Sequence, residues 1–270
     1  MNVFLAAPTY SGIRHDGSAT GIRFCTRRHL VNVPPSKSSL MDRGMNVLWS
    51  MALEDHDRGR ADLFAMIHSD VEPEMFWLDA YVEIMMHRGV DVVSGIIPCK
   101  EGTGRTSVAI DDPDDPIGVE RVLTLDEVYN LPETFGAEVC PGRRLLVNNG
   151  LLLVDLRKPW CDDPSILWHT ENRIDRIKQP DGSIRRIVRC YPQDWYFSRQ
   201  VQRLGGTVAA TRKVQIIHHG DGIYPNTTPW GEWKYDQEYA TSPLKMPEKD
   251  IESMTDEDVR RLMTAPAPLG

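Results

Sequence analysis

The sequence predicts an α/β protein, a sandwich with a mostly parallel central sheet and helices on both faces. Through about residue 97, short apolar runs alternate with amphipathic stretches, which is typical of strands joined by crossover helices. The chain has 270 residues, 41% of them hydrophobic, which is enough for a substantial core. We expect one domain over residues 1–220 and a C-terminal extension over 221–270.

Each expected element follows from local spacing or from breaker residues. The hairpin should turn at 180–183, where Pro, Asp, Gly and Ser follow one another. The expected strands are 2–7, 29–33, 61–67, 90–97, 145–155 and 207–217. Helices are expected at about 39–57, 73–88 and 193–204, a basic hairpin at 173–189 and a short helix at 255–263.

Composition excludes several classes of function. With 31 Lys and Arg against 39 Asp and Glu, the formal net charge is −8, which argues against indiscriminate coating of nucleic acid. No apolar run approaches the roughly 20 residues needed to cross a bilayer, so we expect no membrane span and a cytoplasmic protein. The five cysteines are widely spaced without a Cys-x-x-Cys pair, which is typical of buried free thiols.

The acidic pair Asp70 and Glu72 comes directly after one buried strand and before a helix. In open α/β sheets, ligands gather at the carboxyl ends of the strands. Two carboxylates separated by one residue in an extended loop can turn toward one cation, and Mg²⁺ or Mn²⁺ accepts such oxygen ligands and bridges substrate phosphates. The alternative is a solvated loop in which Glu72 only stabilises the start of a helix.

Two further candidates lie beyond residue 190. Asp194 stands among aromatic residues at the start of a helix, where burial and the helix dipole shift its pKa in opposite directions; it is either a general base or a helix-stabilising carboxylate. His218 and His219 end a strand. Since side chains alternate along a strand, they should face opposite ways, and only one can enter a given site.

Together these motifs resemble the GT-A class of nucleotide-sugar glycosyltransferases, most closely family 2 and its phage and bacterial relatives. The resemblance covers roughly residues 2–220 and implies a three-layer sandwich around a Rossmann-like sheet, located in the host cytoplasm if a phage encodes it. Its pieces are Ala-Pro-Thr-Tyr at 7–10, His-Ser-Asp-Val-Glu at 68–72 as the Asp-x-Asp equivalent, Gln-Asp-Trp at 193–195 as the acceptor motif, and His-His-Gly at 218–220.

The resemblance implies that Asp70, Glu72 or both, with a histidine, hold Mn²⁺ or Mg²⁺ against the diphosphate of UDP-glucose or a similar donor. The family pattern favours His218 over His219, and Glu72 replaces an aspartate. Asp194 would take the proton from the acceptor hydroxyl during inverting transfer of a hexose. Further donor contacts would come from Pro8, Thr9 and Tyr10 around the nucleoside, Arg43 at the diphosphate, and Asn149 and Gly150 near the sugar.

The acceptor is less defined. Six basic residues against two acidic ones lie within 173–189, which a phosphate-rich acceptor such as DNA would explain. Phage relatives of the class glucosylate hydroxymethylated pyrimidines in DNA, and Trp195, Tyr224, Trp230 and Trp233 would stack a flipped base. A glycan or lipid-linked saccharide is the main competing acceptor. Outside the glycosyltransferases, the same motifs are compatible with a nucleotidyltransferase or with a non-catalytic module that binds a sugar or a nucleotide.

Overall fold

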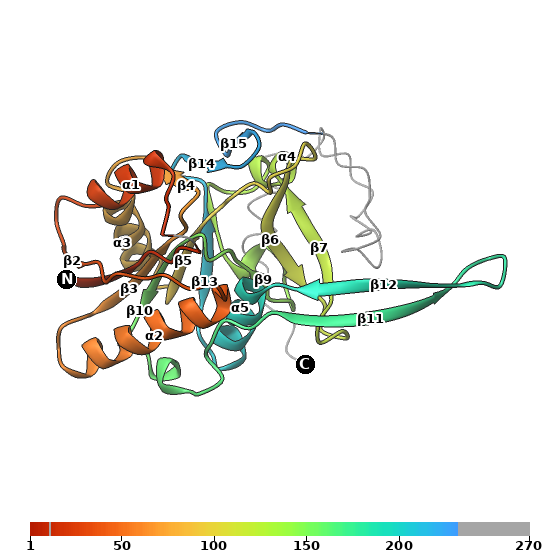
Figure 1. The fold of residues 1–270 in the computed structure, drawn as a ribbon, viewed down its shortest axis with the longest axis horizontal. Coiled ribbons are helices and arrows are strands. Elements are labelled where there is room, and N and C mark those ends of the chain that lie inside the picture. Colours follow the sequence, from red (N-terminus) through yellow and green to blue (C-terminus); the bar gives the residue numbers. More distant parts are fainter. Residues whose placement is uncertain (11, 232–270) are drawn as a thin grey trace.

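A central seven-stranded sheet organises the chain (Figure 1). The computed structural model describes residues 1–10 and 12–231, so the expected helix at 255–263 and Trp233 lie outside the described residues. The strand order is β2-β1-β3-β10-β5-β13-β8. These strands are β1 (Asn2–Ala6), β2 (Leu30–Asn32), β3 (Leu63–Ile67), β5 (Val92–Gly95), β8 (Thr134–Phe135), β10 (Leu151–Asp155) and β13 (Val208–Thr211).

The α/β prediction is confirmed, but the sheet is mixed instead of mostly parallel. β1 is parallel to β2 and β3, and β5 is parallel to β13. In contrast, β10 is antiparallel to both of its neighbours, β3 and β5, and β8 is antiparallel to β13. The start of β10 therefore lies at the same edge of the sheet as the carboxyl ends of β3 and β5.

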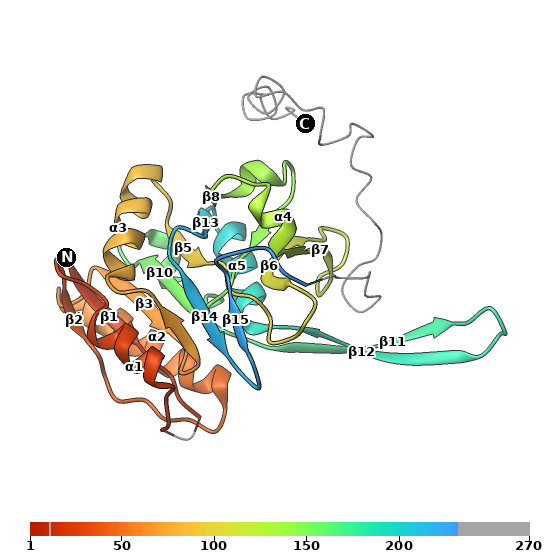
Figure 2. The same cartoon turned by 90° about the horizontal axis from the view of Figure 1, so that it is seen from above.

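Helices cover both faces of this sheet because its strands are apolar on both sides. Along β1, Phe4 and Ala6 join a core with residues of α2 (Met41–Asp57) and α5 (Gln193–Arg203). The alternate residues Val3 and Leu5 join a second core with α3 (Trp77–Arg88) and with Ile22 of α1 (Asp16–Arg23). Figure 2 shows α3 and α2 separated by the sheet.

Three smaller sheets surround the central one. One contains β4 (Val71–Pro73), β14 (Ile216–His219) and β15 (Ile223–Pro225). Asn226 closes this sheet, because its buried amide donates to the carbonyls of Ile96 and Val214 at 3.0 and 3.1 Å. A second sheet contains β6 (Arg105–Asp111), β7 (Val119–Thr124) and β9 (Leu145–Leu146), with α4 (Leu125–Tyr129) following β7. The short 3-10 helices are η1 (Ala137–Val139) and η2 (Pro159–Asp162).

The third small sheet is a hairpin of β11 (Glu171–Lys178) and β12 (Ile184–Tyr191), as the sequence predicted. Its distal part projects away from the rest of the molecule in both views (Figures 1 and 2). Gly182 turns the chain with a φ of 82°, in the left-handed region that glycine tolerates. None of the helices in residues 1–10 and 12–231 has the length and apolar character needed to cross a bilayer.

Candidate functional site

The predicted acidic and histidine motifs meet at one edge of the central sheet. The turn after β3 and the turn before β10 are joined by a hydrogen bond from the His68 amide to the Gly150 carbonyl, at 2.9 Å. β4 then pairs with β14, which sets Val71 opposite His218. The His219 amide also donates to the Asp70 carbonyl at 2.8 Å. Three segments that are distant in sequence are thus held together by backbone hydrogen bonds.

On one side of β14, His218 faces Asp70. Its Nε2 lies 3.8 Å from Asp70 Oδ2, and its Nδ1 donates to the Pro98 carbonyl at 2.8 Å. Lys100 Nζ forms an ion pair with the same carboxylate oxygen. Although burial alone would raise the pKa of Asp70, its contacts with His218 and Lys100 hold that pKa far below the ordinary value. Asp70 is therefore an ionised carboxylate already compensated by a lysine.

His68 lies beside this pair. Burial lowers the pKa of His68 to about 4, so its imidazole is neutral at physiological pH. Its Nε2 is buried and has no hydrogen-bond partner within the described part of the chain. The sequence analysis used the segment 68–72 only for its two acids, and missed this imidazole and Lys100.

On the other side of β14, His219 faces Glu72. Its Nε2 lies 2.6 Å from Glu72 Oε2, and its ring stacks on that of His15 with centroids 3.4 Å apart. The ligand atoms of His15, Glu72 and His219 all lie within 4.8 Å of one another, which makes this the one group of three metal-ligating side chains in residues 1–10 and 12–231. This cluster of His15, Glu72 and His219 is called the His/Glu/His cluster below.

Helix α1 shapes the His/Glu/His cluster. His15 is its N-cap, and its Nδ1 accepts a hydrogen bond from the Gly17 amide at 3.1 Å. A Cβ on Gly17 would lie 2.1 Å from Glu72 Oε2, so glycine is what allows the carboxylate to approach the first turn of the helix. A carboxylate is favoured there by the helix dipole.

The four residues predicted to hold one ion do not form one cluster. Asp70 and His218 lie on one side of β14, Glu72 and His219 on the other. Alternation along the strand separates the two histidines, and Asp70 can follow His218 because it lies in the turn before β4. The preference for His218 that the family pattern gave is not supported by geometry, because His219 is the histidine in the three-residue cluster. His15 was missed, since the sequence between Gly12 and Asp16 carries no recognisable metal motif.

Asp194 lies in the first turn of α5 and is 8% exposed. Burial raises its pKa to about 7, against the opposing effect of the Trp195 amide, which donates to Oδ1 at 2.9 Å. Asn148 Nδ2 lies 3.4 Å from Oδ2. Asp194 also acts electrostatically on the Cys99 thiol, next to the Lys100 that pairs with Asp70. Asp194 and Asp70 therefore both lie near the segment 99–100, and Asn148, which reaches Asp194, is two residues from the Gly150 carbonyl that accepts from the His68 amide.

The residues predicted to contact the nucleotide-sugar donor lie in different environments. Asn149 is buried with its amide 3.3 Å from Met45 Sδ, and the neighbouring Asn148 is the residue that reaches Asp194. Gly150 lies at the edge itself, where a Cβ would meet Ile97 at 2.9 Å. Arg43 is exposed on the first turn of α2 without an ion-pair partner in the described chain.

The segment after β1 is partly buried. Pro8 and Thr9 are buried, with Thr9 Oγ1 donating to the Ser36 carbonyl at 2.9 Å, whereas Tyr10 is 65% exposed. Arg14 donates to the Ala7 carbonyl, and its second terminal nitrogen, Nη1, is buried without a partner among the described residues. Burial lowers the pKa of Arg14. This guanidinium, which the sequence analysis missed, contacts the chain immediately before the predicted nucleoside segment.

The expected stacking surface is only partly present. Trp195 is buried in a small core, and its indole donates to the Ser107 carbonyl at 2.9 Å, so it cannot stack on a base. Tyr224 pairs with His218 in the β14–β15 register, and its ring lies 5.8 Å from that of Trp230. These two half-buried aromatic rings therefore border the His218 side of the site.

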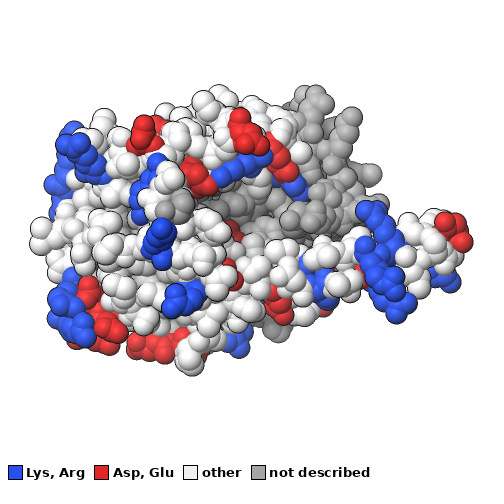
Figure 3. Space-filling model, viewed as in Figure 1, with Lys and Arg blue, Asp and Glu red and all other residues white. Residues whose placement is uncertain are grey.

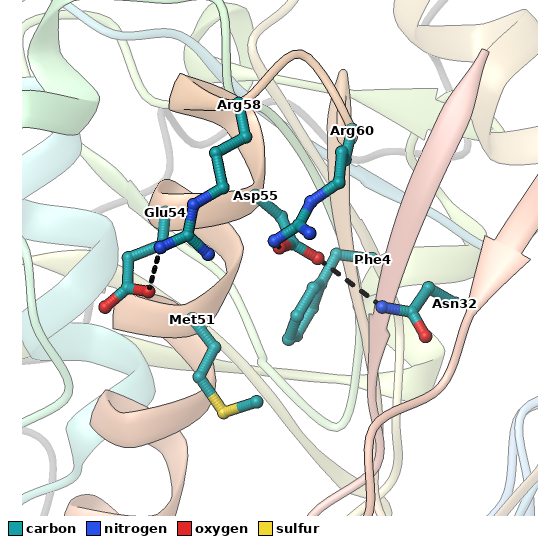
Figure 4. A pocket seen from close by; sticks show the side chains of 7 residues that line it. All are labelled: Phe4, Asn32, Met51, Glu54, Asp55, Arg58 and Arg60. Atoms are coloured by element: carbon teal, nitrogen blue, oxygen red, sulfur yellow. Dashed lines mark hydrogen bonds and ion pairs between the residues drawn. The ribbon is translucent and has the colours of Figure 1, made fainter.

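A separate hollow of about 490 Å³ lies between the end of α2 and strands β1 and β2 (Figure 4). Its charged groups satisfy one another: Arg58 pairs with Glu54 at 3.3 Å, and Arg60 pairs with Asp55. Asn32 Nδ2 also lies 3.4 Å from Asp55. None of the predicted site residues lines this hollow, so it is not part of the candidate site.

Comparisons with known proteins add little to this geometry. No family model matches the chain, and no curated protein matches it. Among solved structures, the crystal structure of A197 from STIV is similar with a TM-score of 0.47 and 14% sequence identity, over 87% of this chain and 99% of that one. A similarity at this level supports no statement about activity.

Proposed function

We propose that this protein is a metal-dependent glycosyltransferase of the GT-A type, which moves a hexose from a nucleotide sugar, preferably a UDP-sugar, to an acceptor hydroxyl with inversion. The observation that carries the proposal is Asp194, a buried carboxyl group with a pKa raised to about 7. Its neighbours Cys99 and Asn148 adjoin Lys100, which pairs with Asp70, and Gly150 at the edge of the sheet. Helices on both faces of the mixed sheet are compatible with this fold type.

Asp194 is suited to be the general base. A group with a pKa near 7 is partly ionised at neutral pH and is basic enough to accept a proton from a hydroxyl as that hydroxyl attacks. The Asn148 amide holds one carboxylate oxygen and the Trp195 amide the other, which fixes the orientation of the group. The proton of the acceptor hydroxyl would move to Asp194 as the new bond to the anomeric carbon forms.

The His/Glu/His cluster is suited to hold the ion. Two imidazoles and one carboxylate favour Mn²⁺ or another transition metal over Mg²⁺, which prefers oxygen ligands alone. An ion bound there would neutralise charge on the departing diphosphate. In binding it, His219 and Glu72 would give up the proton that they now share at 2.6 Å.

The cationic side chains near the site complete the donor subsite in this proposal. Lys100 is 35% exposed beside Asp70, and Arg14 keeps one terminal nitrogen without a partner in the described chain, so both can face the diphosphate or its neighbourhood. Pro8, Thr9 and Tyr10 follow β1 and would contact the nucleoside. Gly150 would allow the sugar to approach the edge of the sheet.

The experiment replaces Asp194 by Asn and measures binding and transfer separately. Transfer is assayed by mass spectrometry of acceptors incubated with a panel of UDP- and GDP-sugars and Mn²⁺, with and without a chelator. Loss of the base should reduce transfer by roughly 10²- to 10⁴-fold, while calorimetry should show unchanged donor binding. Asp162→Asn, which changes an exposed carboxylate at the end of η2, is the control. Full transfer by Asp194→Asn would remove Asp194 as the base, and full transfer in chelator would remove the metal from the mechanism. Donor binding without any transfer by the wild type would favour a non-catalytic binding module.

A further inference from the structure

The hairpin of β11 and β12 has two faces of different character. In its register, residues directly opposite one another share a face: Ile174 faces Val188, Arg176 faces Arg186, and Lys178 faces Ile184. All residues of one face carry even numbers and all residues of the other carry odd numbers. The even face consists of Asn172, Ile174, Arg176, Lys178, Ile184, Arg186, Val188 and Cys190, and the odd face of Glu171, Arg173, Asp175, Ile177, Arg185, Ile187, Arg189 and Tyr191.

The cations at the base of the odd face are used within the protein. Arg173 binds Asp115 at 2.7 Å and Asp175 at 2.6 Å, and Arg189 binds Asp175 at 2.6 Å. Hydrogen bonds from Arg173 lower the pKa of both carboxyl groups. This network ties the hairpin to the loop that contains Asp115, so the odd face near the body has a structural role.

The even face is different. It carries Arg176, Lys178 and Arg186, and contains no acidic residue. None of these three cations has an ion pair with any residue in the described ranges. Between them, Ile174 is 65% exposed, Val188 59% and Ile184 48%. Figure 3 shows Lys and Arg side chains gathered on the projecting hairpin, although the chain as a whole is acidic. Unpaired cations interleaved with exposed aliphatic side chains indicate a surface for a partner.

We propose that the even face binds the backbone of double-stranded DNA and thereby presents the duplex to Asp194 as the acceptor. As an acceptor assignment this rests on the proposed function, whereas the binding itself does not. Arg presents a planar fork that matches phosphate oxygens, and the even face offers two of them opposite each other. The aliphatic side chains would contact sugars or thymine methyl groups beside the phosphates.

The shape of the hairpin fits this partner. Eight residues per strand span roughly 26 Å, and a two-stranded ribbon fits the major groove of B-form DNA, about 12 Å wide. The major groove of double-stranded RNA is too narrow and deep for it. The hairpin also leads directly into the site, because β12 ends at Tyr191 and α5 begins at Gln193. At its root, Thr170 Oγ1 lies 3.1 Å from Gln193 Oε1.

The test measures binding of a 30-base-pair duplex to the full chain by fluorescence anisotropy, in chelator and without donor, between about 50 and 200 mM salt. The triple variant Arg176→Gln, Lys178→Gln, Arg186→Gln should bind roughly 10- to 100-fold more weakly, with a salt slope reduced by up to about 2.7, since each lost phosphate contact removes about 0.9. The control is Arg28→Gln, Arg58→Gln, Lys213→Gln, which makes the same change in charge away from the hairpin and should match the wild type.

A second variant distinguishes DNA from two other possible partners of the even face, a lipid surface and a second copy of the chain. Ile174→Ser with Val188→Ser should change DNA affinity only a fewfold. If that variant instead abolishes binding to phosphatidylserine vesicles, or converts a dimer to a monomer in sedimentation, and the duplex is not bound, the DNA assignment is overturned. An unchanged salt slope in the triple variant also overturns it. DNA binding through the even face without sugar transfer would leave the binding part of this inference standing, and would remove both the acceptor assignment and the proposed function.

Discussion

His218 and His219 are neighbours in β14, but the strand places them in opposite chemical surroundings. His218 faces Asp70, whose charge Lys100 already compensates. His219 faces Glu72 and His15, with no lysine or arginine ion-paired to Glu72 in the described chain. The difference teaches that adjacent residues of one strand meet different partners: one histidine faces a carboxylate that is paired with a lysine, and the other faces a carboxylate that its neighbouring imidazoles alone contact in the described chain.

The strongest test of this comparison is to remove one carboxylate at a time. Glu72→Gln should lower Mn²⁺ affinity by at least about 100-fold, because it removes the only negative charge of the His/Glu/His cluster. Asp70→Asn should change Mn²⁺ affinity by less than about threefold, because Lys100 holds that carboxylate. Electron paramagnetic resonance of free Mn²⁺ measures both. Equal losses in the two variants would show that both sides of β14 hold one ion.

A smaller effect is expected from crowding Glu72 without removing it. Gly17→Ala places a Cβ 2.1 Å from Glu72 Oε2 and must displace the carboxylate, so Mn²⁺ affinity should fall by about tenfold. Gly21→Ala is the matched control on the same helix, because its Cβ would meet the Pro73 ring at 2.7 Å and not Glu72. An equal loss of Mn²⁺ affinity in both variants, with similarly lowered melting temperatures, would mean that damage to α1 weakens the binding and that crowding of Glu72 does not.

His15 should contribute less than Glu72. Its Nδ1 accepts from the Gly17 amide, so the neutral ring carries its proton on Nε2 and must exchange tautomer or release its cap to bind an ion. His15→Asn keeps an N-cap side chain and should weaken Mn²⁺ binding about three- to tenfold. His218→Asn should leave Mn²⁺ titrations unchanged. If His218→Asn lowers Mn²⁺ affinity more than His15→Asn does, His218 is the metal ligand, as the family pattern predicts.

Much of the fold was predictable because apolar periodicity is local. The runs at 2–7, 61–67 and 90–97 became β1, β3 and β5, and the helix expected at 193–204 became α5. The direction of a strand is not local. The run at 145–155 gave β10 with every residue buried, but nothing in its composition showed that it is antiparallel to both neighbours.

The elements that were missed lack periodicity. The sequence of α1 contains two glycines and few apolar residues, and tertiary contacts hold it, such as the bond from Trp77 Nε1 to the Gly21 carbonyl at 3.0 Å. The pairing of β6 with β7 is irregular, which blurs alternation. For α4 the sequence did contain a signal that was overlooked. Thr124 and Glu127 form a capping box, and the spacing Thr-Leu-Asp-Glu is typical of one.

The residues of the candidate site also fall into those that the sequence predicted and those that it did not. Asp70 and Asp194 were predicted as site residues because each stands at the end or start of an element that the sequence pattern indicates. Their partners were not, because Lys100 and Asn148 lie in turns, and His15 comes from a helix that the sequence did not reveal. Sequence reasoning placed the acids at the edge of the sheet, but only the side-chain contacts of the folded chain showed that Asp70 meets His218 and Glu72 meets His219.

The smallest effect concerns the ion pair on the His218 side. Because the pKa of Asp70 is depressed in the folded protein, its contribution to stability is fully present above the unfolded pKa, about 3.8, and is lost only as pH falls through the much lower folded pKa. Lys100→Met keeps the apolar stem that packs on Gly220 but removes the charge. With both side chains about a third exposed, solvent screening limits the loss to about 1 kcal/mol at pH 7. Urea unfolding should show the gap between the two proteins persisting to about pH 3 and closing only at lower pH, as the folded carboxyl group takes up its proton. A gap that stays constant through that acid range would mean that Lys100 stabilises through packing and not through Asp70.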